Sequence, residues 1–481
     1  MATAISSIIG GEKITGSGLA NINPSDVKDV VREYGHVDVN TAKQAIAAAR
    51  AAFPAWAATT PWQKSEILDR AGTEILARAD ELADLLSREE GKTLVEAKGE
   101  VVRAGQIFKY FAGVVMQPHG QALESTRPGV EVQVTREPLG VISVITPWNF
   151  PIAIPAWKIA PALAFGNTVV FKPAELVPAS AYELVDILHR SGLPAGVCNL
   201  VIGKGSVVGS VLTTDPQING VTFTGSVGTG KGILAAEAPL SRKVQLELGG
   251  KNPMVVVDDA DLSIAVEALV QGGFGSTGQR CTASSFTVVT DKIHDKFIAA
   301  VQERLTKWTT GDARKSGVDM GPVVDPSQLK IDQDYLDVAR TGGGEVIGGE
   351  ILDLGTEGYY MAPALVLGTK ATDRINCEEV FGPVVSVIRV SDYEEALATA
   401  NSSTMNLSSG ICTTDLAKAS HFRKHSKAGM VMVNLPTAGV DPHVPFGGRG
   451  DSSYGPREQG FAAVDFFTVS KTAYTAPGNP A

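Results

Sequence analysis

The fold class follows from one stretch of sequence: Val141-Ile142-Ser143-Val144-Ile145-Thr146-Pro147-Trp148-Asn149-Phe150-Pro151. Its first five residues form a nearly continuous β-branched run, which is typical of a strand that is covered on both faces. Similar short runs at 168–171, 221–224 and 254–257 are separated by segments of helix length. This alternation predicts an α/β fold with a parallel sheet and helices on both of its faces.

The residues before this strand are predicted to be mostly helical. Residues 41–53 have helical apolar spacing, with a capping box of Thr41 and Gln44 at the start and Pro54 at the end. A second helix begins at Pro61, and its apolar stripe ends near Gly91.

Further elements are expected on both sides of the first sheet. Residues 179–188 fit a helical connection, and a second α/β region is expected from about 255 to 450. Val130, Val132 and Val134 alternate with polar residues, as in a half-exposed strand.

Composition limits the class of protein. A chain of 481 residues exceeds one hydrophobic core, so two or more domains are expected. The formal net charge of −10 argues against nucleic acid or an anionic membrane as the partner. No signal peptide and no apolar run long enough to span a bilayer are recognisable, which favours a cytoplasmic protein.

The cysteines and histidines do not indicate a metal site. Four cysteines are dispersed without a CxxC spacing, which argues against a disulfide framework or structural zinc and favours a reducing compartment. Three of them (Cys198, Cys377 and Cys412) are interpreted as packing residues. His421 and His425 have i, i+4 spacing but no neighbouring acidic or cysteine ligand, so we interpret them as helix-surface residues.

Two segments offer catalytic groups. Cys281 lies in Phe274-Gly275-Ser276-Thr277-Gly278-Gln279-Arg280-Cys281-Thr282, among small residues, where a thiolate could attack an electrophilic carbon. Glu247, in Leu246-Glu247-Leu248-Gly249-Gly250-Lys251, could serve as its base or activate water. The alternative for Cys281 alone is an ordinary buried thiol.

Polar residues that follow two of the predicted strands could bind a ligand, because α/β proteins bind ligands at the carboxyl ends of strands. The amide of Asn149 could donate to an oxyanion. The alternative for this segment is a proline-rich turn with two aromatic core residues. Lys172 and Glu175 could contact ribose hydroxyls, or they could be ordinary surface residues.

A glycine-rich segment follows the strand at 221–224. Residues 225–232, Gly-Ser-Val-Gly-Thr-Gly-Lys-Gly, could bring backbone N–H groups close to a phosphate. The alternative, a P-loop, is disfavoured because Gly232 stands where a serine or threonine must hold magnesium, and a magnesium requirement for activity would distinguish it. The segment also departs from the G-x-G-x-x-G dinucleotide pattern.

Taken together and in order, these segments resemble the aldehyde dehydrogenase family over nearly the whole chain. Six blocks carry the resemblance, and they stand at 147–151, 172–175, 223–226, 247–251, 278–281 and 379–383. The interval between Glu247 and Cys281 also resembles that of the family. Nucleophile, carboxylate and amide are all present, which argues against a non-catalytic relative.

The resemblance implies a subunit of three parts. A Rossmann-like NAD(P)-binding domain would cover 1–118 and 140–248, and a catalytic domain would cover 249–456. A small β arm for oligomerisation would combine 119–139 with 457–481, and it would make a homo-oligomer, a dimer or a tetramer. In that tail, Val464, Phe466, Phe467 and Val469 are predicted to be strand-like.

The resemblance also implies roles for residues. Cys281 would form a thiohemiacetal, Asn149 and the Cys281 N–H would hold the oxyanion, Glu247 would activate water, and Lys158 would lie near the active site. NAD or NADP, without a metal, would be bound by Thr146, Pro147, Trp148, Lys172, Glu175, Gly225, Ser226, Leu248, Glu379 and Phe381. The substrate, a small aldehyde, would contact Phe150, Arg280 and Phe446.

Two features bear on the choice of aldehyde. Arg280 could lower the pKa of Cys281 and hold an anionic group of the substrate, or it could turn away to pair with an acid or a carbonyl. The segment 434–460 is similar to that of bacterial dehydrogenases that convert α-ketoglutaric semialdehyde to 2-oxoglutarate in sugar-acid catabolism. Succinic or glutaric semialdehyde, or a broad range of aldehydes, are the alternatives. Glu175 should favour NAD, although Lys172 could offset its repulsion of a 2′-phosphate.

Overall fold

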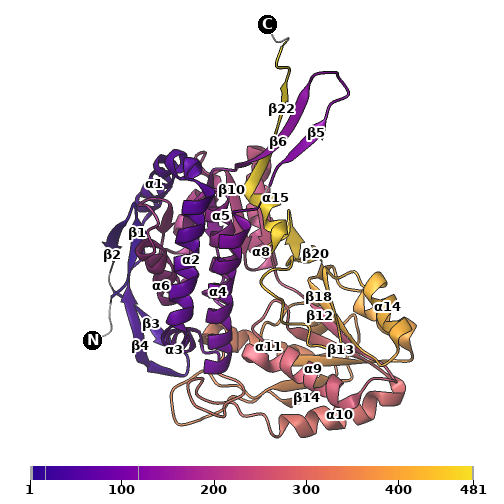
Figure 1. Cartoon of the computed structure of the whole chain (residues 1–481). Helices are drawn as coiled ribbons and strands as arrows, with labels where there is room; N and C mark the ends of the chain where they lie inside the picture. Colours follow the sequence, from indigo (N-terminus) through magenta and orange to yellow (C-terminus); the bar gives the residue numbers. More distant parts are fainter. Residues whose placement is uncertain (1–3, 17, 118, 479–481) are drawn as a thin grey trace.

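The computed structural model describes residues 4–16, 18–117 and 119–478. Residues 1–3, 17, 118 and 479–481 lie outside the described residues. They belong to the predicted domain ranges, and residues 1–3 also belong to the N-terminal segment in which no signal peptide is recognised. Within the described residues, two large sheets flanked by helices form the body, and a three-stranded sheet projects from it (Figure 1). The predicted α/β fold class is confirmed.

In the described part of the chain the first sheet has eight strands. Its five central strands are parallel, and its edges are antiparallel. In spatial order the strands are β2 (Glu12–Thr15), β1 (Ser6–Ile9), β9 (Cys198–Leu200), β8 (Thr168–Lys172), β7 (Val141–Ile145), β10 (Gly220–Thr224), β11 (Lys243–Glu247) and β21 (Ser453–Tyr454).

Strand β7 lies near the middle of this sheet, as its apolar run predicts. Val141 packs with α1 (Val39–Ala58) and α7 (Gly205–Thr214) on one face of the sheet. Ile142 and Val144 belong to the cluster on the other face. Both faces of the strand are therefore buried, and its carboxyl end leads directly to Asn149.

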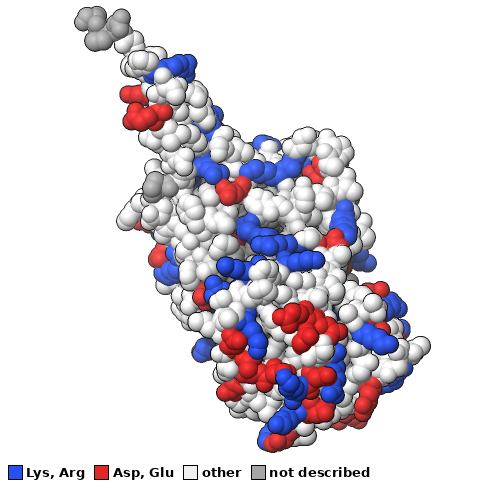
Figure 2. Space-filling model, turned by 90° about the vertical axis from the view of Figure 1, so that its right-hand side faces the viewer, with Lys and Arg blue, Asp and Glu red and all other residues white. Residues whose placement is uncertain are grey.

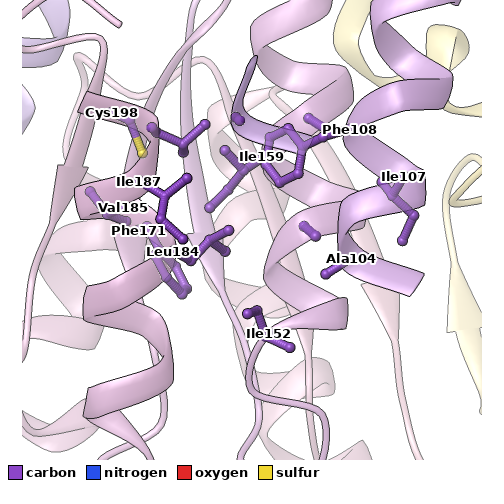
Figure 3. Packing of buried hydrophobic residues seen from close by; sticks show 14 of the residues in the cluster. Ala104, Ile107, Phe108, Ile152, Ile159, Phe171, Leu184, Val185, Ile187 and Cys198 are labelled. Atoms are coloured by element: carbon purple, nitrogen blue, oxygen red, sulfur yellow. The ribbon is translucent and has the colours of Figure 1, made fainter. Parts of the chain in front are cut away.

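The cluster on the second face is the largest core of the protein. Figure 3 shows Phe171 of β8 and Cys198 of β9 packed with side chains of the covering helices, among them Phe108 and Ile159. Cys198 is completely buried there, in agreement with its interpretation as a packing residue. The helices on this side of the sheet are α2 (Pro61–Ala77), α3 (Ala79–Glu90), α4 (Leu94–Val114), α5 (Ala153–Ala164) and α6 (Pro178–Arg190).

The N-terminal region differs from its prediction in having strands before the helices. Besides β1 and β2, it contains the hairpin of β3 (Leu19–Asn23) and β4 (Asp26–Tyr34). Strand β1 joins the main sheet through Ile8, whose partner is Leu200. Such a distant partner explains why the short strand was missed, since local sequence carries little of that information.

The limits of the predicted helices also need correction. The N-cap of α1 is Asp38, which accepts from Thr41 N, so the capping box of Thr41 and Gln44 is wrong. The helix continues past Pro54 to bury Trp56, and the apolar burial offsets the cost of the proline. The second helix does begin at Pro61 with a Thr60 capping box, but it is interrupted at Arg78 before α3.

The second sheet has seven strands among the described residues, and all of its neighbours are parallel except one edge pair. In spatial order they are β14 (Glu345–Gly348), β15 (Ala364–Leu367), β16 (Val384–Val390), β13 (Ser284–Thr290), β12 (Asn252–Val256), β18 (Ser408–Cys412) and β19 (Met430–Val433). Helix α8 (Val227–Glu237) packs against β10 and β11 of the first sheet. The helices of the second region are α9 (Leu262–Phe274), α10 (Asp291–Leu305), α11 (Pro326–Thr341), α12 (Arg374–Cys377), α13 (Tyr393–Ala400) and α14 (Leu416–His425). The short strands β17 (Met405–Asn406) and β20 (Arg449–Gly450) form a separate pair.

The projecting three-stranded sheet is formed by strands from the two segments predicted for the arm. Strand β6 (Glu131–Pro138) lies between β5 (Gln121–Glu124) and β22 (Thr468–Thr475). Val469 is in β22, but Val464, Phe466 and Phe467 form the short helix α15 (Val464–Phe467). Their strand assignment is wrong, because their side chains are buried in the core of the first sheet.

Surface charge is mixed on the face shown in Figure 2, where acidic and basic side chains are interspersed. No helix of the described residues combines the length and apolar character needed to cross a bilayer. His421 and His425 stack on α14 with ring centroids 3.9 Å apart, and His421 also bonds to Tyr393.

Candidate active site

The loop before Cys281 has an unusual backbone. Ser276, Thr277 and Gly278 all have left-handed φ values of 49°, 57° and 67°. For serine and threonine such values cost about 1–3 kcal/mol each, and they persist only where the surroundings enforce them. Here Ser276 N donates to Glu96 (2.7 Å), and Thr277 Oγ1 donates to the Gly321 carbonyl (3.1 Å). The loop that carries the predicted nucleophile is therefore held rigidly.

Cys281 lies where two cavities meet. One cavity of about 240 Å³ and another of about 260 Å³ both have Cys281 in their walls. Burial raises the pKa of the Cys281 thiol far above its usual value, and the carboxylates of Glu379 and Glu247 raise it further. The thiol is therefore neutral at pH 7, and a base must take its proton before the sulfur can attack.

Arg280 does not activate this thiol, contrary to one of its predicted roles. Its Nη2 donates to Glu96 Oε1 (2.8 Å), and its Nε donates to Ser276 Oγ (3.0 Å). The side chain has thus turned to an acid, which was the alternative for this residue. Arg280 nevertheless lines the 240 Å³ cavity together with Phe150 and Phe446, the other predicted substrate residues.

Asn149 lies in the turn between β7 and α5 and lines the 260 Å³ cavity with Cys281. Its Nδ2 donates to the Gln279 carbonyl at 2.9 Å, and its own carbonyl accepts from Lys92 Nζ at 2.6 Å. These contacts fix the amide against the Cys281 loop. The geometry places a hydrogen-bond donor in the cavity that the thiol lines.

Glu247 ends β11, behind the cavities rather than in their walls. Its Oε2 accepts from Ser453 Oγ at 2.6 Å, and only 2% of the residue is exposed. Burial raises the pKa of Glu247 well above its usual value, and the charge of Glu458 raises it further. A carboxyl group with a raised pKa is suited to general base catalysis near neutral pH.

A groove of about 760 Å³ runs along the carboxyl ends of the first sheet's strands. Seven of the predicted cofactor residues line it: Thr146, Pro147, Trp148, Lys172, Glu175, Gly225 and Ser226. Glu175 Oε1 accepts from Gly205 N at 2.8 Å, and Lys172 Nζ donates to the Pro173 carbonyl at 3.0 Å.

Helix α8 begins at this groove. Ser226 is its N-cap, and Ser226 Oγ accepts from Thr229 N at 3.3 Å. Gly228, Gly230 and Gly232 therefore lie inside the helix, so the expected glycine-rich turn is shorter than predicted. The N-terminus of α8 still provides free N–H groups and a positive dipole end, which favour a phosphate.

The 260 Å³ cavity contains the remaining predicted cofactor residues, Leu248, Glu379 and Phe381. Glu379 accepts from Gly250 N at 2.9 Å, and burial raises its pKa to about 7. Phe381 has a left-handed φ of 65° and meets Trp148 edge to face, with ring centroids 5.4 Å apart. This cavity shares Trp148, Gly225 and Ser226 with the groove, so the two are continuous.

Lys158 lines none of these three cavities. It is completely buried, pairs with Glu458 and donates to Thr222 Oγ1 at 2.8 Å. Glu458 also accepts from Trp157 Nε1 at 2.6 Å. Lys158 and Glu458 both act on the pKa of Glu247, the lysine lowering it and the glutamate raising it.

Sequence reasoning missed Glu458, Ser453, Lys92 and Arg103. Arg103 lies on α4 and lines the 240 Å³ cavity. Its helical spacing from Glu96, Gly99 and Glu100, which line the same cavity, was the available signal, because residues three and four apart share a helix face.

Known proteins resemble this chain over almost its full length. Residues 12–473 match the aldehyde dehydrogenase family. The chain is 43% identical to alpha-ketoglutaric semialdehyde dehydrogenase of Bacillus subtilis, with 95% of this chain and 94% of that protein covered. It is 40% identical to 2,5-dioxopentanoate dehydrogenase of Saccharolobus solfataricus, with 96% and 97% covered. A crystal structure of betaine aldehyde dehydrogenase from Staphylococcus aureus in complex with NAD+ superposes with a TM-score of 0.96 at 32% identity, covering 99% of this chain and 96% of that one.

Proposed function

The chain belongs to the aldehyde dehydrogenase family, and we propose that it oxidises α-ketoglutaric semialdehyde (2,5-dioxopentanoate) to 2-oxoglutarate with NAD or NADP. One observation carries the proposal. A groove suited to a dinucleotide leads through one cavity to the Cys281 thiol, and a second cavity with two arginines in its wall also reaches that thiol.

The groove fits a nicotinamide dinucleotide in its shape and in its polar groups. The hydroxyls of Thr146 and Thr224, which both line it, are buried without a partner in the described residues. Such orphaned groups are costly unless a ligand satisfies them. We assign the ribose of the adenosine half to Lys172 and Glu175, the pyrophosphate to Gly225, Ser226 and the start of α8, and the nicotinamide half to Glu379 and Phe381.

The first chemical step is the attack of Cys281. The thiol proton passes to Glu247, whose side chain must first leave Ser453. The sulfur then bonds to the aldehyde carbon while the C=O π electrons move to oxygen. Asn149 Nδ2 and the Cys281 N–H donate to that oxygen, and one such donor contributes about 3–4 kcal/mol to the transition state.

The nicotinamide ring, when bound, supplies the acceptor for the hydride that leaves the same carbon. The C=O bond re-forms, and a thioester remains on Cys281. Glu247 releases the thiol proton to solvent and then takes a proton from water, and the water oxygen attacks the thioester carbon. The C–S bond breaks, its electron pair returns to sulfur, and the carboxylate product leaves. The net change is aldehyde, water and oxidised nicotinamide to carboxylate, reduced nicotinamide and two protons.

Lys158 acts in this scheme as a positioning residue. It touches neither cavity, but its buried pair with Glu458 sets the charge behind Glu247. The negative charge of Glu458 raises the pKa of Glu247 and the positive charge of Lys158 lowers it, so the pair sets the pH at which Glu247 can accept a proton.

The arm is proposed to bind other copies of the chain. Strand β22 is exposed over all but its first residue and β5 over its whole length, and both are edge strands of the arm sheet. Open strand edges pair readily with another chain. We propose a homo-oligomer, a dimer or a tetramer, and a monomer in analytical ultracentrifugation would contradict it. The division into domains at 248/249 and a cytoplasmic location belong to the same proposal.

The proposed substrate is tested with a panel of aldehydes. Formation of the reduced nicotinamide is followed with α-ketoglutaric, succinic and glutaric semialdehydes and with neutral aldehydes, each with NAD and with NADP. We expect the highest kcat/KM for α-ketoglutaric semialdehyde. A higher value for succinic semialdehyde or for a neutral aldehyde would contradict the proposal.

A further inference from the structure

The charged groups around the substrate cavity are almost all paired. Lys92 Nζ lies 2.7 Å from Glu100 Oε2, and both side chains are 1% exposed. Arg280 Nη2 lies 2.8 Å from Glu96 Oε1. Lys92 also lies 3.9 Å from Glu90 Oε2, so neither Lys92 nor Arg280 is a free cation that could bind an ionic substrate.

Arg103 is the cation of this cavity that has no ion pair among the described residues. Its Nη2 donates to Gln459 Oε1 at 3.0 Å, and its Nε is buried without a hydrogen-bond partner in the described part of the chain. The guanidinium lies 5.5 Å from the centre of the Trp157 ring. A buried donor without a partner is costly, which indicates that a ligand completes the site.

The neighbouring acids do not neutralise Arg103. Glu100 is already paired with Lys92, and Asp441 is exposed and lies beyond ion-pair distance. Burial lowers the pKa of Arg103 from its usual value, but arginine stays protonated at neutral pH. Among the charged side chains that line this cavity, Arg103 is therefore the cation without an ion pair in the described residues.

Arg103 and Cys281 line the same cavity. Once Cys281 has lost its proton, the thiolate charge raises the pKa of Arg103. Phe150, Trp157 and Phe446 also line this cavity and make much of its wall apolar. An ionic contact is stronger in such surroundings than in water.

We propose that Arg103 binds the distal carboxylate of the substrate and thereby selects anionic aldehydes, while Arg280 holds the catalytic loop through Glu96. This assignment rests on the proposed function and names the residue that recognises its substrate class. The guanidinium presents parallel N–H donors that match a carboxylate. The aldehyde end of a short chain then points to Cys281, and the aromatic walls contact its methylene groups.

The experiment compares α-ketoglutaric semialdehyde with pentanal, a neutral aldehyde of the same carbon count. For the Arg103→Gln variant we expect the ratio of the two kcat/KM values to fall about 10- to 150-fold, the change that corresponds to roughly 1.5–3 kcal/mol for a hydrogen bond to a charged group. The loss should appear mainly in KM for the semialdehyde. Arg103→Lys should restore part of the ratio, because it keeps the charge without the fork geometry.

Two further variants serve as controls. Lys98→Gln removes a cation from the same helix, but from an exposed pair with Asp80, and its ratio should equal that of the wild type. The double variant Glu96→Gln with Arg280→Gln removes the other arginine without leaving its acid unpaired. If the ratio of the two kcat/KM values falls further in this double variant than in Arg103→Gln, the carboxylate is bound by Arg280 and our assignment is overturned.

Inhibition by glutarate, a dicarboxylate without an aldehyde, gives a second measurement. Glutarate should compete with pentanal, and Arg103→Gln should weaken its inhibition by a similar factor. Equal inhibition of variant and wild type would overturn the assignment. The wild type could instead prefer succinic semialdehyde, which would contradict the proposed substrate. If Arg103→Gln then removed that preference, the role of Arg103 in binding the carboxylate would still be supported. A wild type without any preference for anions would overturn both.

Discussion

Replacing Lys158 with methionine should destabilise the protein strongly. The lysine is 0% and Glu458 is 2% exposed, so the variant leaves a buried carboxylate without its cation. Breaking a buried pair in this way costs about 3–5 kcal/mol. For a domain of about 250 residues, at about 2 °C per kcal/mol, the midpoint of thermal unfolding should fall by roughly 6–10 °C.

The double variant Lys158→Met with Glu458→Gln removes both charges, so it separates the interaction energy of the ion pair from the effect of each single substitution. Glutamine is neutral and still offers an oxygen to Trp157 Nε1, which now donates to Glu458 at 2.6 Å. We expect this double variant to lose about 1–2 kcal/mol, less than Lys158→Met alone. Thermal unfolding of the wild type, both single variants and the double variant gives the coupling directly. If the losses of the single variants simply add, the buried pair does not have the role assigned to it.

Three further predictions concern catalysis. Glu247 is neutral below its raised pKa, so the rate of thioester hydrolysis should increase as the pH rises through that value. Because the charge of Glu458 raises the pKa of Glu247, Glu458→Gln should move this increase to lower pH. A pH profile that Glu458→Gln leaves unmoved would contradict this coupling. Asn149→Ala should lower kcat by about 10²–10³ with little change in KM, since the amide is proposed to act on the oxyanion; steady-state kinetics check this, and an unchanged kcat would exclude the role. Glu175→Gln should raise kcat/KM for NADP relative to NAD by up to about tenfold, because it removes a negative charge from the proposed 2′-phosphate position; an unchanged cofactor ratio would show that Glu175 does not face the ribose.

The sequence predicted the central sheet and much of the site because both depend on local patterns. The apolar run 141–145 became β7, and the residues that follow it reach the groove and the cavity of Cys281. Strand ends of a parallel sheet lie at one edge, so Asn149, Lys172 and Gly225 could be placed together without knowledge of side-chain contacts.

Features that depend on distant partners could not be predicted. The pairing of Arg280 with Glu96 spans 184 positions, and nothing near Arg280 indicates it. Residues 464–467 contain a short apolar run, which fits a strand as well as a buried helical turn. The run is helical because its side chains fill the core, whereas ladder pairing with β6 begins only at Thr468.

The central claim is that the Cys281 sulfur bonds to the aldehyde carbon, and rapid-mixing kinetics of Cys281→Ala and Cys281→Ser test it most directly. With α-ketoglutaric semialdehyde and a saturating nicotinamide cofactor, we expect wild-type enzyme to form the reduced cofactor and both variants to form none above background. Acid quenching of the wild type should trap an acyl group on the peptide that contains Cys281. Oxidation of the aldehyde by either variant at the wild-type rate would contradict the account.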